Sequence, residues 1–234
     1  MSTSPEHDRI STEFESALRL LSRERGWTRE AGSLPVARWA FICKETFFAW
    51  VKARPNVRVS PDVYLIWNPV EPAPSSWRLW ELGHLPPDFA LEVASEDRRK
   101  EYDVNPDKYD ALGATELVIY DPHGLGGRGR GPLRRYRRQP DGRFEAQETG
   151  EPVVYSSVLD AWLVATVGDD GYSLRISRDP HGISIVPTLF EAVLQADRAQ
   201  RDALAEADAE RRRRVEVERE LEQLRALMAA RAAP

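Results

Sequence analysis

The pattern of hydrophobic and polar positions predicts an α/β core followed by one long helix. Between Ser60 and Tyr120, polar segments separate three apolar runs: Val63–Ile66, Phe89–Ala94 and Leu117–Tyr120. The second run is apolar on both faces apart from Glu92, which is typical of a strand covered on both sides. The pattern therefore predicts at least three strands of one buried sheet.

The polar segment between the second and third runs is predicted to be helical, most securely from Asp107 to Leu112. Pro106 suits the first turn of such a helix, and Gly113 suits its end. A strand, a helix and a strand in this space predict a βαβ crossover.

Weaker patterns flank this centre. Residues 1–8 are polar and predict a loose tail, whereas apolar residues at helical spacing predict an amphipathic helix from Ser11 to Glu24. The segment Val36–Val51 fits either a buried helix or two short strands. Val57–Trp67 predicts a strand, and Trp77–Leu85 allows no assignment.

The second half of the core is predicted to consist of strands. A glycine-rich stretch from His123 to Gly131 predicts a flexible hairpin tip, because it leads toward another strand and not into the helix that a phosphate-binding loop requires. Pro140, Asp141 and Gly142 predict a β-hairpin turn. The expected strand segments are Leu133–Arg138, Arg143–Gln147, Val153–Val167, Tyr172–Ser177 and Ile183–Val186.

From Leu189 to about Ala230 the sequence predicts one helix of about 60 Å. Its apolar residues follow alternating steps of three and four, interrupted at Gln200, Glu210 and Arg214. They are Leu189, Val193, Ala196, Ala203, Ala207, Val217, Leu221, Leu224 and Met228. We expect a core at 1–187 and a coiled-coil-like helix at 188–234 that pairs with another copy or a partner; the alternative is a single solvated helix.

Composition narrows the class of protein. The 234 residues are 41% hydrophobic, enough for one domain with a core, and Cys43 is the single cysteine, which excludes an intrachain disulfide and a multi-cysteine zinc site. The net charge of −5 does not favour a nucleic-acid binder, although a nuclease can concentrate positive charge around one groove. No apolar signal core and no run of about 18 apolar residues is found, so we expect a cytoplasmic protein without a membrane span.

Asp62 and Glu92 are candidate metal ligands. They lie on neighbouring predicted strands, and the backbone carbonyl of Val93 offers a third oxygen. Magnesium prefers oxygen ligands and keeps several waters, so two or three such groups suffice. A nearby lysine such as Lys108 would stabilise a metal-activated water.

Each acid also has a structural interpretation. A carboxylate in an apolar strand is costly unless it is paired or bound to a metal, so Glu92 would otherwise need an ion pair with Lys108 or Arg98. Asp62 follows Pro61, and Pro-Asp before a strand is ordinary turn chemistry. Asp88 has the same interpretation with less support.

The sequence resembles the Uma-two family of the PD-(D/E)XK restriction-endonuclease-like superfamily. The resemblance covers roughly residues 57–165 and rests on the order and spacing of several short motifs: Ser60-Pro-Asp62, Pro86 to Ser95, Tyr109, Leu112-Gly113 and Glu116 to Pro122. It implies a restriction-endonuclease-like core with a mixed central β-sheet flanked by helices. It also implies Mg²⁺-dependent endonuclease cleavage of DNA, with Mn²⁺ as a possible substitute ion.

Residue by residue, the resemblance assigns metal binding to Asp62 and Glu92. The superfamily places a lysine two residues after the acid, where this chain has Ala94. The Uma-two pattern moves the lysine to the following helix, four residues before Tyr109, where this chain has Asn105. Lys108, three residues further along, is the proposed catalytic replacement, and Lys100 is a second candidate.

Three functions compete. The first is a Mg²⁺-dependent DNA endonuclease with Asp62, Glu92 and Lys108 as catalytic residues. The second is a catalytically inactive scaffold that assembles into a homo-oligomer through the C-terminal helix. The third is a DNA- or RNA-binding regulator, which would use the arginines between Arg128 and Arg143; a solvated strand face is the alternative for these residues.

Overall fold

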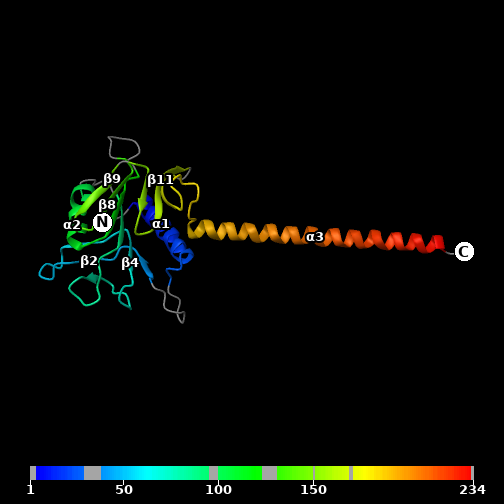
Figure 1. Ribbon diagram of the computed structural model, residues 1–234, viewed down its shortest axis with the longest axis horizontal. Helices are drawn as coiled ribbons and strands as arrows, with labels where there is room; N and C mark the ends of the chain where they lie inside the picture. Colours follow the sequence, from blue (N-terminus) through cyan, green and yellow to red (C-terminus); the bar gives the residue numbers. More distant parts are fainter. Residues whose placement is uncertain are drawn as a thin grey trace. The chain divides into compact units, whose positions relative to one another are not determined.

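The computed structural model describes residues 4–28, 38–94, 100–122, 131–149, 151–168 and 171–232 (Figure 1). The chain divides into two compact units, Met1–Leu189 and Phe190–Pro234. Residues 123–130 of the hairpin tip predicted at His123–Gly131 lie outside the described residues, and so do Arg98, Arg128 and Arg130.

A six-stranded sheet forms the centre of the first unit. Its strands run in the order β1 (Ala40–Cys43), β4 (Val63–Trp67), β6 (Phe89–Val93), β7 (Glu116–Tyr120), β8 (Leu133–Arg138) and β9 (Phe144–Thr149). β6 and β7 are parallel, and every other neighbouring pair is antiparallel. The mixed central sheet predicted from the sequence is therefore confirmed.

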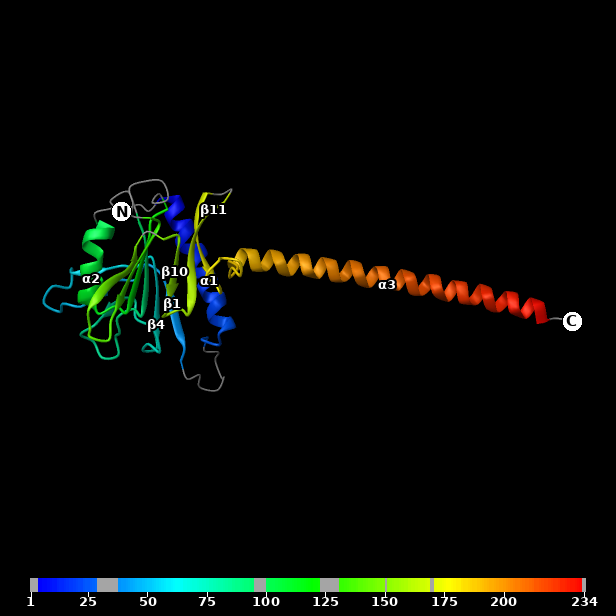
Figure 2. The same ribbon diagram turned by 45° about the horizontal axis from the view of Figure 1, so that its top comes forward.

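The two faces of this sheet have separate cores, because successive side chains of a strand point to opposite faces. One core joins Val63, Leu91 and Val118 to helix α1 (Pro5–Glu24). The other joins Tyr64, Ala90 and the apolar side of helix α2 (Asn105–Leu112). Figure 2 shows the sheet between these two helices.

Two small sheets complete the unit. The first is an antiparallel meander of β10 (Val153–Ser156), β11 (Ala161–Gly168) and β12 (Gly171–Ser177). The second has the order β3 (Arg58–Val59), β2 (Phe48–Ala49) and β5 (Trp77–Arg78). The predicted strand at Ile183–Val186 is reduced to one bridge between Ile185 and Ser177.

The βαβ crossover is confirmed. After β6, a π-helical turn η1 (Lys100–Val104) leads into α2, and β7 follows parallel to β6. Pro106 lies in the first turn of α2, and Gly113 ends it with φ at 90°, a left-handed conformation that glycine adopts without steric cost.

Three boundaries differ from the prediction, and one open alternative is decided. The strand expected at Val153–Val167 is two strands, β10 and β11, separated at residues 157–160. Helix α1 begins at Pro5, so the loose tail predicted at 1–8 is partly wrong; the Ser4 hydroxyl caps it by accepting the His7 N–H at 3.2 Å. Val36–Val51 contains the two short strands β1 and β2, one of the two alternatives. The strand predicted at Val57–Trp67 is interrupted between β3 and β4 at residues 60–62.

Helix α3 (Leu189–Ala232) confirms the long C-terminal helix. Its side chains are exposed where the structure describes them, apart from a few half-buried residues in its first turn. None of the described helices is long and apolar enough to cross a bilayer.

Candidate active site

Glu92 lies near the carboxyl end of β6, on the face that α2 covers. It shares this face with Ala90 and Ala94, while Leu91 and Val93 point into the core under α1. Glu92 is only 5% exposed, and the Tyr109 hydroxyl donates a hydrogen bond to its Oε1 at 2.6 Å. A buried carboxylate needs such donors, so α2 holds Glu92 in a defined orientation.

Asp62 lies immediately before β4, the antiparallel neighbour of β6. Its Oδ2 accepts the backbone N–H of Val93 at 2.7 Å and lies 3.1 Å from Nε2 of His7 in α1. The accepted N–H belongs to the peptide that joins Glu92 to Val93. The structure thus brings the Asp62 carboxylate against the backbone of the second predicted acid.

The Asp62 carboxylate still has an available atom. Its Oδ1 accepts no hydrogen bond from the residues that the structure describes, and its side chain is 13% exposed. His7 and the Val93 N–H fix one oxygen, which leaves the second as a possible ligand. Hydrogen bonds of this kind hold metal-binding carboxylates in orientation.

Asp121 is a third buried acid, whose role the sequence interpretation missed. It directly follows β7, and the ladder pairs Glu92 with Ile119, so by alternation Asp121 points to the face of Glu92. The Tyr102 hydroxyl of η1 donates to its Oδ2 at 3.2 Å. The signal available in the sequence was an acid directly after an apolar strand, at the carboxyl end where sites of parallel strands gather.

Asp88 has a structural role. It precedes β6, at the end of that strand opposite Glu92, and its Oδ2 accepts the Trp67 N–H at 2.8 Å. Burial raises the pKa of this carboxyl group. Asp88 therefore ties β6 to β4 away from the other acids.

The predicted lysines lie at the margin of this face. Lys108 of α2 is half-buried and forms no hydrogen bond or ion pair with the described residues, while its neighbour Tyr109 is fully buried. Lys100 begins η1, and its side chain lies outside the described part of the chain. Asn105, one turn before Tyr109, is buried on the same side of the helix.

Arg134 of β8 is a cation that the sheet places on this face. Glu92 pairs with Ile119, and Ile119 pairs with Arg134, so the three residues form a row across neighbouring strands. Two strand spacings separate the first from the third, about 10 Å between Cα atoms. The Arg134 guanidinium carbon lies 5.4 Å from the Tyr102 ring centroid, and its Nη1 donates to the Tyr136 hydroxyl at 3.2 Å.

Three other arginines of the hairpin are already paired. Arg135 points to the opposite face, where its Nη1 lies 3.8 Å from the buried Glu116 carboxylate. Arg138 pairs with Asp110 at 2.8 Å, and Arg143 with Asp141 at 2.7 Å. By contrast, Arg134 has no carboxylate partner among the described residues.

Oxygen ligands are present, but the arrangement is not that of a preformed cluster. Within the part of the chain that the structure describes, no three His, Cys, Asp or Glu side chains are grouped to hold a metal ion. Magnesium keeps several waters and accepts one or two carboxylates, so Asp62 and Glu92 remain chemically suitable as ligands.

Comparison with known proteins shows the family of this chain. The model of the family described as "Uma2: Putative restriction endonuclease" matches residues 1–167. The chain belongs to the Uma2 family. The match includes α1 and therefore His7, whereas the resemblance read from motifs began near residue 57.

A search of solved structures finds a crystal structure titled as a putative nuclease belonging to DUF820 from Anabaena variabilis ATCC 29413. The TM-score is 0.44 at 16% identity, with 68% of this chain and 76% of that chain covered. No curated protein matches the chain.

Within the Uma2 family pattern given above, this chain departs at the lysine. Ala94, two residues after Glu92, is small and buried, and Asn105 occupies the alternative position. The face that should carry the lysine ammonium therefore carries a neutral amide. Among the residues that the structure describes, Lys108 and Arg134 are candidate sources of positive charge near the acids, and Lys100 is a further candidate from the sequence.

Proposed function

We propose that this Uma2 protein is a Mg²⁺-dependent DNA endonuclease that hydrolyses phosphodiester bonds, with Mn²⁺ as a substitute ion. The observation that carries the proposal is the contact of the Asp62 carboxylate with the Glu92–Val93 peptide, beside a buried Glu92. Family membership and two oriented carboxylates on adjacent strands support it.

Asp62 and Glu92 would hold the ion, with the Val93 carbonyl as a further oxygen. When bound, the ion lowers the pKa of a coordinated water and offsets charge that develops on the phosphate. His7 and the Val93 N–H keep one Asp62 oxygen in place, which would leave the other oxygen to hold the ion. Tyr109 performs the equivalent task for Glu92.

Lys108 would support the attacking water and the phosphate charge. Its side chain is half-buried and unpaired among the described residues, so a long, flexible ammonium is available on the helix that also carries Tyr109. In a site that excludes water, such a charge interacts more strongly with the reacting atoms.

The test is nicking of supercoiled plasmid DNA with and without Mg²⁺ or Mn²⁺. Glu92→Ala should abolish metal-stimulated nicking, while Glu145→Ala on β9, at a half-buried acid paired only with Arg143 among the described residues, should leave it unchanged. Circular dichroism establishes that both variants are folded. Nicking by Glu92→Ala at the parental rate would remove the catalytic assignment.

The source of positive charge is tested on the same substrate. Lys108→Met should lower the rate at least tenfold if this lysine supports the water, since one stabilising donor is worth roughly 10²–10³ in rate at an enclosed site. Lys100→Met tests the second candidate lysine in the same way. Asn105→Lys, which restores the family position, should raise the rate or rescue Lys108→Met.

A second function is favoured by the missing lysine. In this alternative the nuclease core is an inactive scaffold, and α3 assembles the protein into a homo-oligomer. Calorimetric titration with Mn²⁺ distinguishes the two, because a scaffold has no reason to retain a cation site. Heat of binding that disappears in Asp62→Asn supports the nuclease.

A further inference from the structure

Helix α3 carries a seam that a monomer leaves exposed. The seam starts at Leu189 and recurs at alternating steps of four and three residues to Met228, which makes these positions a and d of a heptad. Val217 is 53% exposed, Leu224 58% and Met228 73%. Apolar side chains repeated along one face of a helix stabilise it when a second helix covers them.

The charges beside the seam fit a second copy of this helix as the partner. With Val193 at position a, the charged g residues are Glu206, Arg213 and Glu220, and the e residues five positions later are Arg211, Glu218 and Arg225. In a parallel, in-register pair of helices, each g residue faces the e residue of the following heptad in the partner. All three charged combinations are then of opposite sign.

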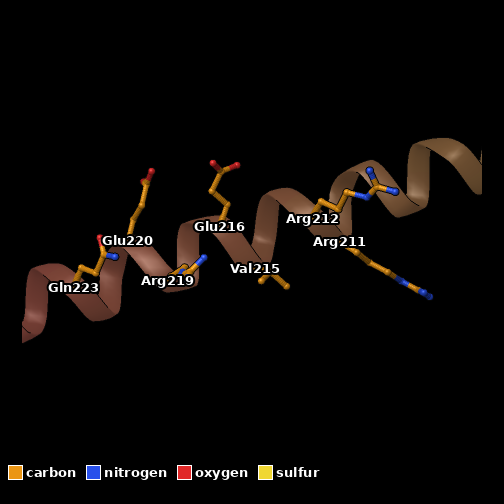
Figure 3. A pocket seen from close by; sticks show the side chains of 7 residues that line it. All are labelled: Arg211, Arg212, Val215, Glu216, Arg219, Glu220 and Gln223. Carbon is orange, nitrogen blue, oxygen red and sulfur yellow. The ribbon is translucent and has the colours of Figure 1, made fainter.

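The two flanks lie on different sides of the seam. Figure 3 shows Arg211 and Glu220 pointing to opposite sides of α3, as expected of an e and a g residue nine positions apart. An identical helix can therefore present Arg225 to Glu220 on one flank and Glu220 to Arg225 on the other. We propose that α3 is the interface for a second copy of this chain, as a parallel, in-register two-helix coiled coil.

Two polar residues of the seam, Glu210 and Arg214, would favour an antiparallel pair of helices, but only at the centre of the pair. An antiparallel pair centred between Glu210 and Arg214 would match these two across the seam, but it would place Glu206 against Glu220 and Arg213 against its own copy. In the parallel pair, Glu210 keeps its partner Arg214 in the same helix, at 2.5 Å. Polar seam layers weaken a coiled coil while fixing its register, so they are compatible with the proposal.

The proposal is independent of nuclease activity and is tested on the full chain by sedimentation equilibrium. The parent should reach twice its 26.6 kDa mass. Glu220→Arg and Arg225→Glu should each weaken association about tenfold, because each reverses two exposed ion pairs per dimer. The double variant should restore association to within about twofold, since it recreates both pairs with exchanged signs.

Arg219→Glu is the matched control. It makes the same charge reversal on the outer side of the helix, shown in Figure 3, and should leave association unchanged. A parent that stays monomeric at every concentration overturns the proposal. A double variant weaker than either single variant also overturns it, because the two residues then do not face each other.

A disulfide tests orientation separately. Leu224→Cys should form an intermolecular disulfide with the same position of a second copy under mild oxidation, whereas the parent, with only Cys43, should not. In an antiparallel pair centred near the middle of α3, this residue would face the other half of the partner helix, out of reach. A dimer without this cross-link therefore refutes the parallel arrangement.

Discussion

The hydroxyl of Tyr109 provides the most informative single perturbation. It is buried, and it donates to Glu92 Oε1 at 2.6 Å, a hydrogen bond between a neutral donor and a carboxylate. Tyr109→Phe removes this donor and changes the ring volume little, so no cavity is created. Hydrogen bonds to charged groups contribute about 1.5–3 kcal/mol, and we expect a loss of about 2 kcal/mol in the free energy of unfolding.

For a domain of this size, that loss lowers the unfolding temperature by about 4–8 °C. For the metal site and activity that we propose, the same change should weaken Mn²⁺ binding and metal-stimulated nicking about 10- to 100-fold, as the loss of a partner that orients a ligand does at known metal sites. Urea denaturation and calorimetric titration measure the two effects independently.

Tyr64→Phe serves as the control. Tyr64 is buried on the same face, and its hydroxyl accepts the Trp77 indole N–H at 3.0 Å. Tyr64→Phe also removes a buried hydrogen bond and should lower the free energy of unfolding by about 1–3 kcal/mol. Tyr64 contacts no predicted metal ligand. If Tyr109→Phe had the stability and Mn²⁺ affinity of the parent, the assignment of Tyr109 as the group that orients Glu92 would be refuted.

Three further outcomes are expected. Gly113→Ala should lower the free energy of unfolding by about 1–2 kcal/mol in urea, because residue 113 has φ at 90°; unchanged stability would contradict this. Arg135→Ala should cost about 3 kcal/mol or more in thermal unfolding by leaving the buried Glu116 carboxylate without its cation, and a smaller loss would show that its serine partners suffice. The hydrogen bond from Arg178 lowers the pKa of Glu24 below its usual 4.5, so the stability from this ion pair is complete above pH 4.5 and is lost as the pH falls through the folded-state pKa. Glu24→Gln should therefore lose this part of the fall in melting temperature at acid pH, and an identical pH dependence in both proteins would exclude the pair.

Local signals explain what the sequence predicted well. The crossover from β6 through α2 to β7 depends on an apolar strand, a proline in the first helical turn and a glycine after the last, all adjacent in the chain. The hairpin of β8 and β9 is likewise confirmed with a Pro-Asp-Gly turn. Each signal acts within a few residues, which is the range over which propensity decides conformation.

Long-range packing explains what was missed. The unassigned segment at Trp77 forms a two-residue strand beside Phe48, where Trp77 stacks on that ring at 6.0 Å and donates to Tyr64. His7 contacts Asp62 from α1, a helix that was predicted to begin only at Ser11. No periodicity within either segment encodes such contacts, because they arise only when separate elements pack together.

The acid face carries a possible source of positive charge besides the lysines near the predicted helix. Helix α2 presents Asn105 and Tyr109 to the sheet and keeps Lys108 at its margin, so the position where a lysine was expected carries a buried amide. The sheet itself supplies Arg134, in the row that contains Glu92, on a strand that the family motifs do not include. Because Arg134 lies against Tyr102, and Tyr102 in turn binds Asp121, its guanidinium is held near an acid without an ion pair to any carboxylate in the described ranges. For the nuclease activity that we propose, a cation in that state keeps its charge for an incoming phosphate, which is the role that the resemblance assigns to a lysine.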